Sequence, residues 1–388
     1  MAGIPDCDVV VVGGGVVGSA VALCLARRGA AVTLLEAQSG LALQASGTNS
    51  GILHTGFDST PGELETRLIL RSAALRDCVL DVLEVPVLRC GAVLVPEDDA
   101  GRATVEALER GAEHNGVSVL HHDTGILEVP GEAVTDPVAF TLALAGSAIA
   151  AGAQVLVDAP VEALAAGDDD LLDVTVGSPA LPRLSCRAVV NCAGLRADDV
   201  AGLAGDATFR VYPRKGEFLV FDPPDGLALK RIRLPVPEAG TKGVIVFPTL
   251  DGKVVAGPTA HDQDDKGDWS VRADAEGEIR AKVARLLPSL GSAQPIASYA
   301  GLRPAGVGAN YLIGHSAALR GLVHVAAIRS TGLTASLGIA EYVSGLVAEL
   351  GVPLGEPAPL RPGPPPPGLG LDGPWWTRTA CYEAARAA

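Results

Sequence analysis

The opening segment of the chain constrains its fold more than any other part. Residues 8–12 (DVVVV) place a run of valines after a single acid, a pattern typical of a parallel strand buried on both faces. The run leads directly into GGGVVG, in which Gly13, Gly15 and Gly18 fit the pattern G-x-G-x-x-G. The first glycine permits a tight turn, the second lets the backbone approach a pyrophosphate, and the third lets the following helix pack against the strand.

The residues after these glycines complete a dinucleotide-binding unit. Residues 19–28 predict a helix that stops at Gly29, and residues 31–35 predict a second strand that ends on Glu36. A carboxylate at that position accepts hydrogen bonds from an adenosine ribose. No arginine closely follows Glu36 to receive a 2′-phosphate, which disfavours NADP and leaves NAD and FAD open.

Length and composition fit a globular chain with more than one domain. The chain has 388 residues, 48% hydrophobic and 19% charged, a balance that excludes disorder and coiled coil. Its formal net charge of −15 argues against nucleic acid as a partner. The seven cysteines include no C-x-x-C pair, so we expect no zinc, iron–sulfur or other metal site.

Localisation is expected to be cytoplasmic, which is compatible with peripheral association with a membrane. Aspartates near the N-terminus stand where a signal peptide needs positive charge, and unpaired cysteines fit a reducing compartment. Residues 138–157 are uncharged, but Asp136-Pro137 predicts a helix start and Ala151-Gly152 a break. We therefore expect a buried helix and a short strand there, and no transmembrane segment.

Four later segments place small or hydroxyl residues where backbone can approach a cofactor. Residues 45–56 (ASGTNSGILHTG) carry glycines and hydroxyls, and residues 189–195 (VVNCAGL) end a buried strand in a small-residue turn. Residues 301–304 (GLRP) predict a turn before a short hairpin. Residues 330–336 (STGLTAS) open a helix whose N-terminus would stabilise negative charge on a ligand.

Together with the opening glycines, these motifs resemble the D-amino-acid-oxidase-like superfamily of FAD-dependent oxidoreductases. Residues 49–58 (NSGILHTGFD) look like two of its branches. These are the L-2-hydroxyglutarate oxidases or dehydrogenases and the catalytic subunits of anaerobic-type glycerol-3-phosphate dehydrogenases. Residues 212–218 (YPRKGEF) and 257–260 (GPTA) strengthen the likeness, which covers residues 6 to about 350.

The chain departs from both branches. The glycerol-phosphate branch usually carries a cysteine-rich iron–sulfur extension at its C-terminus, where this chain has only Cys381. The hydroxyglutarate branch usually has paired tyrosines where this chain has Phe57-Asp58-Ser59. A third small substrate therefore stays open beside these two.

The resemblance implies an α/β fold with an α+β second domain. It implies a Rossmann-like FAD-binding domain built from discontinuous segments, residues 1–82, 138–208 and 297–350. A smaller, mostly antiparallel β-sheet substrate domain is expected from the short strands and turns of residues 83–137 and 209–296. Residues 351–388 contain a run of prolines and Trp375-Trp376, and predict a polyproline-like tail docked by its tryptophans.

The resemblance also implies which residues bind FAD. They come from the glycine turn, the ribose acid and the four later segments, with Val161 in addition. They are Gly13, Gly15, Val17, Gly18, Glu36, Ala45, Ser46, Thr48, Asn49, Ser50, Gly51, Val161, Ala193, Gly194, Gly301, Arg303, Ser330, Thr331, Gly332, Leu333 and Thr334.

Flavin oxidation of a C–H bond needs a group for the substrate's anionic end and a base for its proton. Arg303 is the candidate for the anion, because a guanidinium binds a carboxylate bidentately and the equivalent arginine does so in amino-acid oxidases of the superfamily. His54 is the candidate base, because imidazole titrates near neutrality and the family places this segment beside the isoalloxazine. The alternative role for His54 is a hydrogen bond to the flavin, and His315 is the second candidate.

Two lysines of the expected substrate domain complete the site prediction. Lys215 and Lys242 lie in predicted strands of that domain. Solvated surface charge is the alternative for both. In a chain of net charge −15, their convergence with Arg303 would create a local positive site for a dianion.

The leading prediction is an FAD-dependent enzyme that oxidises a small anionic substrate at a CH–OH group by hydride transfer to flavin N5. The substrate would be a 2-hydroxy acid such as L-2-hydroxyglutarate, or glycerol 3-phosphate. Oxygen or a quinone-linked carrier would accept the electrons. Two alternatives stay open: an FAD-dependent amino-acid or amine oxidase, and a flavin electron-transfer or interaction module with no substrate of its own.

Overall fold

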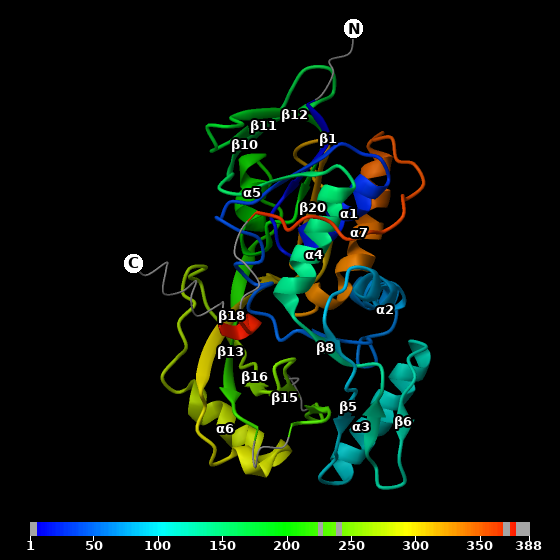
Figure 1. The fold of residues 1–388 in the computed structure, drawn as a ribbon, viewed down its shortest axis with the longest axis vertical. Coiled ribbons are helices and arrows are strands. Elements are labelled where there is room, and N and C mark those ends of the chain that lie inside the picture. Colours follow the sequence, from blue (N-terminus) through cyan, green and yellow to red (C-terminus); the bar gives the residue numbers. More distant parts are fainter. Residues whose placement is uncertain (1–5, 224–227, 238–242, 368–372, 378–388) are drawn as a thin grey trace.

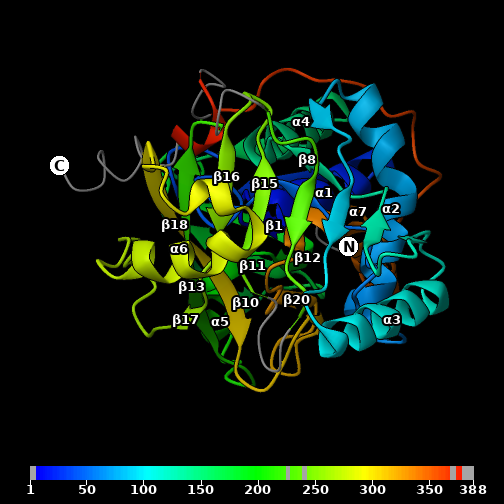
Figure 2. The ribbon, with the colours of Figure 1, turned by 90° about the horizontal axis from the view of Figure 1, so that it is seen from below.

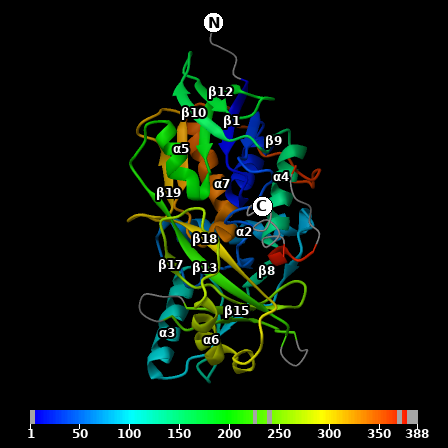
Figure 3. The ribbon, with the colours of Figure 1, turned by 90° about the vertical axis from the view of Figure 1, so that its left-hand side faces the viewer.

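Two large β-sheets divide the described residues into an upper and a lower half (Figure 1). The structure is a computed structural model that describes residues 6–223, 228–237, 243–367 and 373–377. The long strands β13 (Val211–Phe221) and β18 (Ala297–Gly306) run side by side from the middle of the molecule into the lower half (Figure 3).

The upper sheet has eight strands and contains the predicted dinucleotide-binding unit. Its parallel part runs β9-β2-β1-β12-β20, in which Val9 of β1 pairs with Val32 of β2 and Ala188 of β12. The predicted buried strands are therefore confirmed. The strands of this sheet are β1 (Cys7–Val12), β2 (Val32–Leu35), β9 (Gln154–Leu156), β10 (Val161–Ala166), β11 (Leu172–Val176), β12 (Arg183–Asn191), β19 (Leu312–His315) and β20 (Leu322–Ala326).

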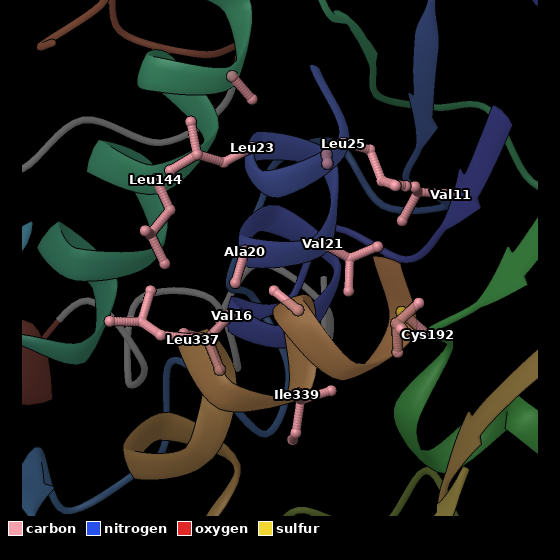
Figure 4. Packing of buried hydrophobic residues seen from close by; sticks show 14 of the residues in the cluster. Val11, Val16, Ala20, Val21, Leu23, Leu25, Leu144, Cys192, Leu337 and Ile339 are labelled. Carbon is pink, nitrogen blue, oxygen red and sulfur yellow. The ribbon is translucent and has the colours of Figure 1, made fainter. Parts of the chain in front are cut away.

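Four helices build the core beside this sheet: α1 (Val16–Arg27), α2 (Leu64–Val82), α4 (Pro137–Ala150) and α7 (Gly332–Glu349). Helix α1 packs against α4 and α7, and α2 against α7. Figure 4 shows Ala20 and Leu23 of α1 facing Leu144 of α4, with Val16 beside Leu337 of α7. These side chains are small or branched aliphatic groups, which lets the helices pack closely.

The uncharged stretch at residues 138–157 forms the predicted helix and strand, α4 followed by β9. The Asp136 side chain caps α4 by accepting hydrogen bonds from the backbone N–H groups of Val138 and Ala139, at 2.9 Å each. Within the ranges that the structure describes, no helix combines the length and the apolarity needed to cross a membrane.

The lower sheet has nine strands and is antiparallel except where β14 pairs with β5. Helix α6 (Ala275–Leu286) lies across this sheet, and α3 (Asp99–His114) lies on the opposite side of the view from α6 (Figure 2). A small sheet of β3 (Ile52–Leu53), β8 (Ala133–Thr135) and β4 (Val87–Leu88) lies between the halves. The other strands of the lower sheet are β5 (Ala92–Leu94), β6 (Leu120–His121), β7 (Leu127–Val129), β14 (Ile232–Leu234), β15 (Ile245–Pro248), β16 (Val254–Gly257) and β17 (His261–Asp262).

The segment GLRP differs from its prediction. It is no turn but the middle of β18, which pairs with β13 over ten residues. Pro304 is tolerated because β18 pairs with β13 alone, so its missing N–H faces no second strand. The expected boundary of the FAD-binding domain at residue 297 thus falls at the start of a strand of the lower sheet.

The proline-rich segment after α7 returns along the upper half of the molecule. The backbone N–H groups of Gly355 and Ala358 donate to the carbonyls of Arg28 and Arg27 at the end of α1. Ser147 of α4 donates to the Arg361 carbonyl at 2.7 Å. Farther on, Trp375 is buried in the hydrophobic cluster of the lower sheet, with its ring edge-on to Tyr299 at a centroid distance of 5.4 Å.

Replacing Trp375 with alanine should destabilise the fold. The side chain is 2% exposed, so its removal leaves a large cavity and should lower the free energy of unfolding by about 3–5 kcal/mol. Trp376→Ala is the matched control, because Trp376 is only partly buried and should cost less. Urea denaturation of both variants measures the difference, and equal losses would contradict a specific docking of Trp375.

Candidate active site

A cavity of about 440 Å³ begins at the glycine turn after β1 and extends to Arg303 and the N-terminus of α7. The walls come from eight separate stretches of the sequence, including the two turns that follow β1 and β12. The carboxyl ends of neighbouring parallel strands meet at this edge of the upper sheet, which is where open α/β sheets bind nucleotides.

The glycine turn depends on very close backbone contacts. A Cβ atom on Gly13, whose φ is +108°, would lie 2.6 Å from the Cys192 carbonyl oxygen. A Cβ atom on Gly18 would lie 1.9 Å from the Gly13 carbonyl oxygen. The roles predicted for these two glycines, a tight turn and close packing of helix against strand, agree with this geometry.

Glu36 lies on the cavity wall at the end of β2. Its carboxylate accepts hydrogen bonds from Gly14 N–H at 2.6 Å and Gln38 N–H at 2.8 Å. Burial raises the pKa of Glu36, and these backbone hydrogen bonds oppose the rise. Each carboxylate oxygen keeps a further lone pair that can accept a hydrogen bond from a ribose hydroxyl, and this role of Glu36 stays a prediction.

The predicted FAD-binding residues divide into two groups. One group lines the cavity: Gly13, Gly15, Val17, Glu36, Ala45, Ser46, Asn49, Val161, Ala193, Gly194, Arg303, Ser330, Gly332 and Leu333. The other group supports its walls without lining it: Gly18, Thr48, Ser50, Gly51, Gly301, Thr331 and Thr334. Thr48, for example, lies 2.8 Å from where a Cβ atom on Gly301 would be, so it packs directly on β18.

The N-terminus of α7 forms one end of the cavity. Ser330, with a φ of +68°, and Gly332 and Leu333 line the wall there. Behind them, Thr331 donates to Glu65 at 2.6 Å and shares a 2.8 Å hydrogen bond with the Tyr311 hydroxyl. This fixed helix end directs its positive dipole at the cavity, as predicted.

Arg303 lines the cavity and is held by backbone carbonyls. Its Nε donates to Arg214 O at 3.1 Å, and its Nη2 donates to Lys215 O at 3.1 Å and to Thr259 O at 2.7 Å. No carboxylate of the described residues forms an ion pair with it. Burial, and then the charges of Arg214 and Arg329, lower the pKa of Arg303 to about 10, so it stays charged near neutrality.

Two further arginines surround Arg303. Arg214, opposite it on β13, forms a bidentate pair with Asp262 at 2.5 and 2.7 Å. The half-buried Arg329 side chain has no hydrogen-bond or ion-pair partner in the part of the chain that the structure describes. The hydrogen bonds from Arg214, with the charges of Arg303 and Arg329, lower the pKa of Asp262. Three arginines against one aspartate leave a local positive excess.

Three other residues were predicted to bind the substrate. Two of them lie away from the cavity walls, and the third lies outside the described residues. Lys215 faces away from Arg303: it pairs with Leu302 across the ladder, and neighbouring residues of a strand point to opposite faces. Its ammonium instead pairs with Asp268 at 2.8 Å. His315 lies on β19, paired with Glu349 at 3.0 Å and away from the cavity walls. Lys242 lies outside the described residues.

His54 does not line the cavity itself but is bonded to the helix that forms one end of it. Its backbone N–H donates to Thr334 Oγ1 at 3.1 Å, in the first turn of α7. Its ring nitrogen Nδ1 lies 2.9 Å from Glu132 Oε2, a carboxylate that the sequence did not single out. Arg329 was also missed, although it directly precedes the predicted segment 330–336. No local pattern could find Glu132, because it lies 78 residues from His54.

Comparison with protein-family models matches residues 8–346 to the family described as FAD dependent oxidoreductase. The chain belongs to this family. The protein is therefore an FAD-dependent oxidoreductase, and its cofactor is FAD. The cavity fits that cofactor, because the side-chain-free glycine turn, the ribose acid and the end of α7 all border it.

Relatives with named activities cover most of the chain. A glycerol 3-phosphate dehydrogenase of Caloramator mitchellensis is 28% identical over 88% of this chain and 74% of its own length. A mitochondrial L-2-hydroxyglutarate dehydrogenase of Caenorhabditis elegans is 29% identical over 66% of this chain and 64% of its own. The dithionite-reduced L-α-glycerophosphate oxidase of Mycoplasma pneumoniae with FAD bound superposes with a TM-score of 0.82 and 26% identity, over 94% and 98% of the two chains.

Alanine at Gly18 should impair FAD retention. Its Cβ would collide with the Gly13 carbonyl and displace the turn, at a cost of about 1–3 kcal/mol in stability. Gly345→Ala in α7 is the matched control, since nothing lies within 4 Å of that Cβ, and it should stabilise by about 0.5–1 kcal/mol. The ratio of flavin to protein after purification, with urea denaturation, checks both. Full FAD content in Gly18→Ala would contradict the packing argument.

Proposed function

We propose that the protein oxidises a CH–OH group of a small anion, with glycerol 3-phosphate as the leading substrate and a 2-hydroxy acid such as L-2-hydroxyglutarate as the second candidate. The observation that supports this most is the uncompensated positive charge at the cavity, Arg303 with Arg329 beside it. A buried cation without an acidic partner is costly unless a ligand supplies the missing charge.

In this proposal Arg303 and Arg329 bind the anionic end of the substrate. Arg303 is rigid, because three hydrogen bonds to backbone carbonyls fix its guanidinium plane. A fixed arginine orients the substrate carbon at little entropic cost. FAD, when bound, supplies the acceptor for the hydrogen that leaves this carbon with its electron pair. His54 takes the proton of the substrate hydroxyl.

The order of the two substrates follows from the relatives. Those named for glycerol 3-phosphate match 86–88% of the chain, and those named for L-2-hydroxyglutarate match 64–66%. Oxygen or a quinone-linked carrier would accept the electrons. We also propose that the upper sheet with its helices forms the FAD-binding domain, and that the lower sheet, now including β18, forms the substrate domain.

Anaerobic mixing of the FAD-loaded protein with a substrate panel tests this function. The panel contains glycerol 3-phosphate, L-2-hydroxyglutarate, other 2-hydroxy acids, amino acids, and uncharged glycerol as the matched control. We expect glycerol 3-phosphate to bleach the flavin at the lowest concentration and glycerol to fail. Bleaching by amino acids alone would replace the proposal with amine oxidation, and bleaching by nothing would favour an electron-transfer module.

Arg329→Gln should weaken substrate binding and change kcat little. Losing one hydrogen bond to a charged group costs about 1.5–3 kcal/mol, so KM should rise by roughly 10- to 100-fold. Arg320→Gln is the matched control: it removes the same charge from a side chain that is 83% exposed. Steady-state kinetics at two salt concentrations measure both variants. Equal KM values for the two would show that Arg329 does not contact the substrate.

A further inference from the structure

We propose that Glu132 is a positioning residue that sets the tautomer and the basicity of His54. This inference rests on the proposed function only in the step in which His54 acts as a base. Glu132 lies in the turn before β8, on a part of the chain far from every predicted site motif. Nothing in the family resemblance assigned it a role.

The Glu132 carboxylate is fully buried and uses both oxygens. Oε2 lies 2.9 Å from His54 Nδ1, while Oε1 accepts hydrogen bonds from Thr55 N–H at 2.6 Å and from Thr55 Oγ1 at 2.9 Å. Its side chain is 0% exposed. A buried carboxylate with only acceptor atoms needs donors, so the Nδ1 of His54 carries the hydrogen in this contact.

The backbone around this pair is fixed by a buried arginine of α2. Arg76 is 7% exposed and donates to the carbonyls of Leu53 at 3.0 Å, His54 at 2.7 Å and Gly131 at 2.5 Å. One guanidinium therefore ties the end of β3 and the adjoining His54 to the turn that carries Glu132. These bonds hold the backbone on both sides of the pair in place, and the Thr55 donors hold the Glu132 carboxylate.

Three of the described elements bring charge close to His54. Glu132 contributes a negative charge in contact with the ring, Arg76 of α2 a positive charge at the backbone, and the N-terminus of α7 a partial positive charge near Thr334. The two positive groups disfavour an imidazolium, and the carboxylate favours it. Glu132 is thus the group that allows His54 to accept a proton at this position.

The tautomer of His54 decides which ring nitrogen can accept the proton of the substrate. With Nδ1–H donated to Glu132, the lone pair of the neutral ring is on Nε2. When the substrate hydroxyl loses its proton, the O–H bond breaks and an Nε2–H bond forms. The resulting imidazolium is stabilised by the adjacent carboxylate. Glu132 acts through His54 and touches no substrate atom.

Glu132→Gln tests the inference. We expect the pKa of His54 to fall by about 1–3 units, because an opposite charge in contact is lost. The rate of flavin reduction should fall on the order of 100-fold, with KM nearly unchanged, because a general base contributes about 10²- to 10⁴-fold and does not bind substrate. Glu132→Asp, which restores the charge, should recover part of both.

Nitrogen-15 NMR of the histidines, assigned with His54→Asn, measures the pKa without any substrate. Glu109→Gln is the matched control, because Glu109 pairs with His121 at 2.6 Å on the surface and should leave His54 and activity unchanged. A His54 pKa unchanged in Glu132→Gln overturns the inference. If that pKa falls while no panel compound bleaches the flavin, the pairing stands and the proposed function fails.

The native protein gives a second test that does not depend on how the variants fold. Its neutral His54 should show hydrogen on Nδ1 and none on Nε2 in the same nitrogen-15 spectra. The opposite tautomer would overturn the inference. Thr55→Val, which removes one donor but keeps the carboxylate, should leave this tautomer in place.

Discussion

The contact between the glycine turn and the end of β12 is the constraint on which the rest of the molecule depends. Gly18 must lie against the Gly13 carbonyl, and Gly13 against the Cys192 carbonyl, with no room for a side chain at either. This contact sets the angle at which α1 leaves the sheet, and α1 is the helix on which α4 and α7 pack. The cofactor cavity and the core are therefore consequences of the same close approach.

The position of Arg303 in the site depends on the ladder between β13 and β18. This ladder places Arg303 opposite Arg214 and turns Lys215 to the other face. Both orientations follow from the alternation of side chains along a strand, so a shift of β18 by one residue would turn Arg303 to the face that Lys215 occupies. The small residues Gly216 and Gly301, paired across the ladder, leave room beside Arg303 and for Thr48 of the upper half.

Features with short sequence separation were predictable, and those set by distant pairing were not. The unit from β1 to Glu36 follows from local patterns, and the structure has it in the expected register. The prediction of a turn at GLRP is wrong because glycine and proline signal turns, whereas its strand partner lies about ninety residues away. The direction of the Lys215 side chain depends on the register of a sheet, which no local pattern gives. The pairing of Glu132 with His54 depends on a contact across 78 residues.

Charge connects the site to the composition of the chain. The protein has a net charge of −15, yet three arginines and one aspartate leave positive charge beside the cavity. Removing a cation from water without an acidic partner is costly, and this cost falls chiefly on Arg303, because Arg214 pairs with Asp262 and Arg329 is only half-buried. An anion that pairs with them would offset that cost and stabilise the native state by mass action. The same positive charge therefore lowers the stability of the native state without a ligand and makes the site selective for an anion. This is the arrangement expected where stability and function compete.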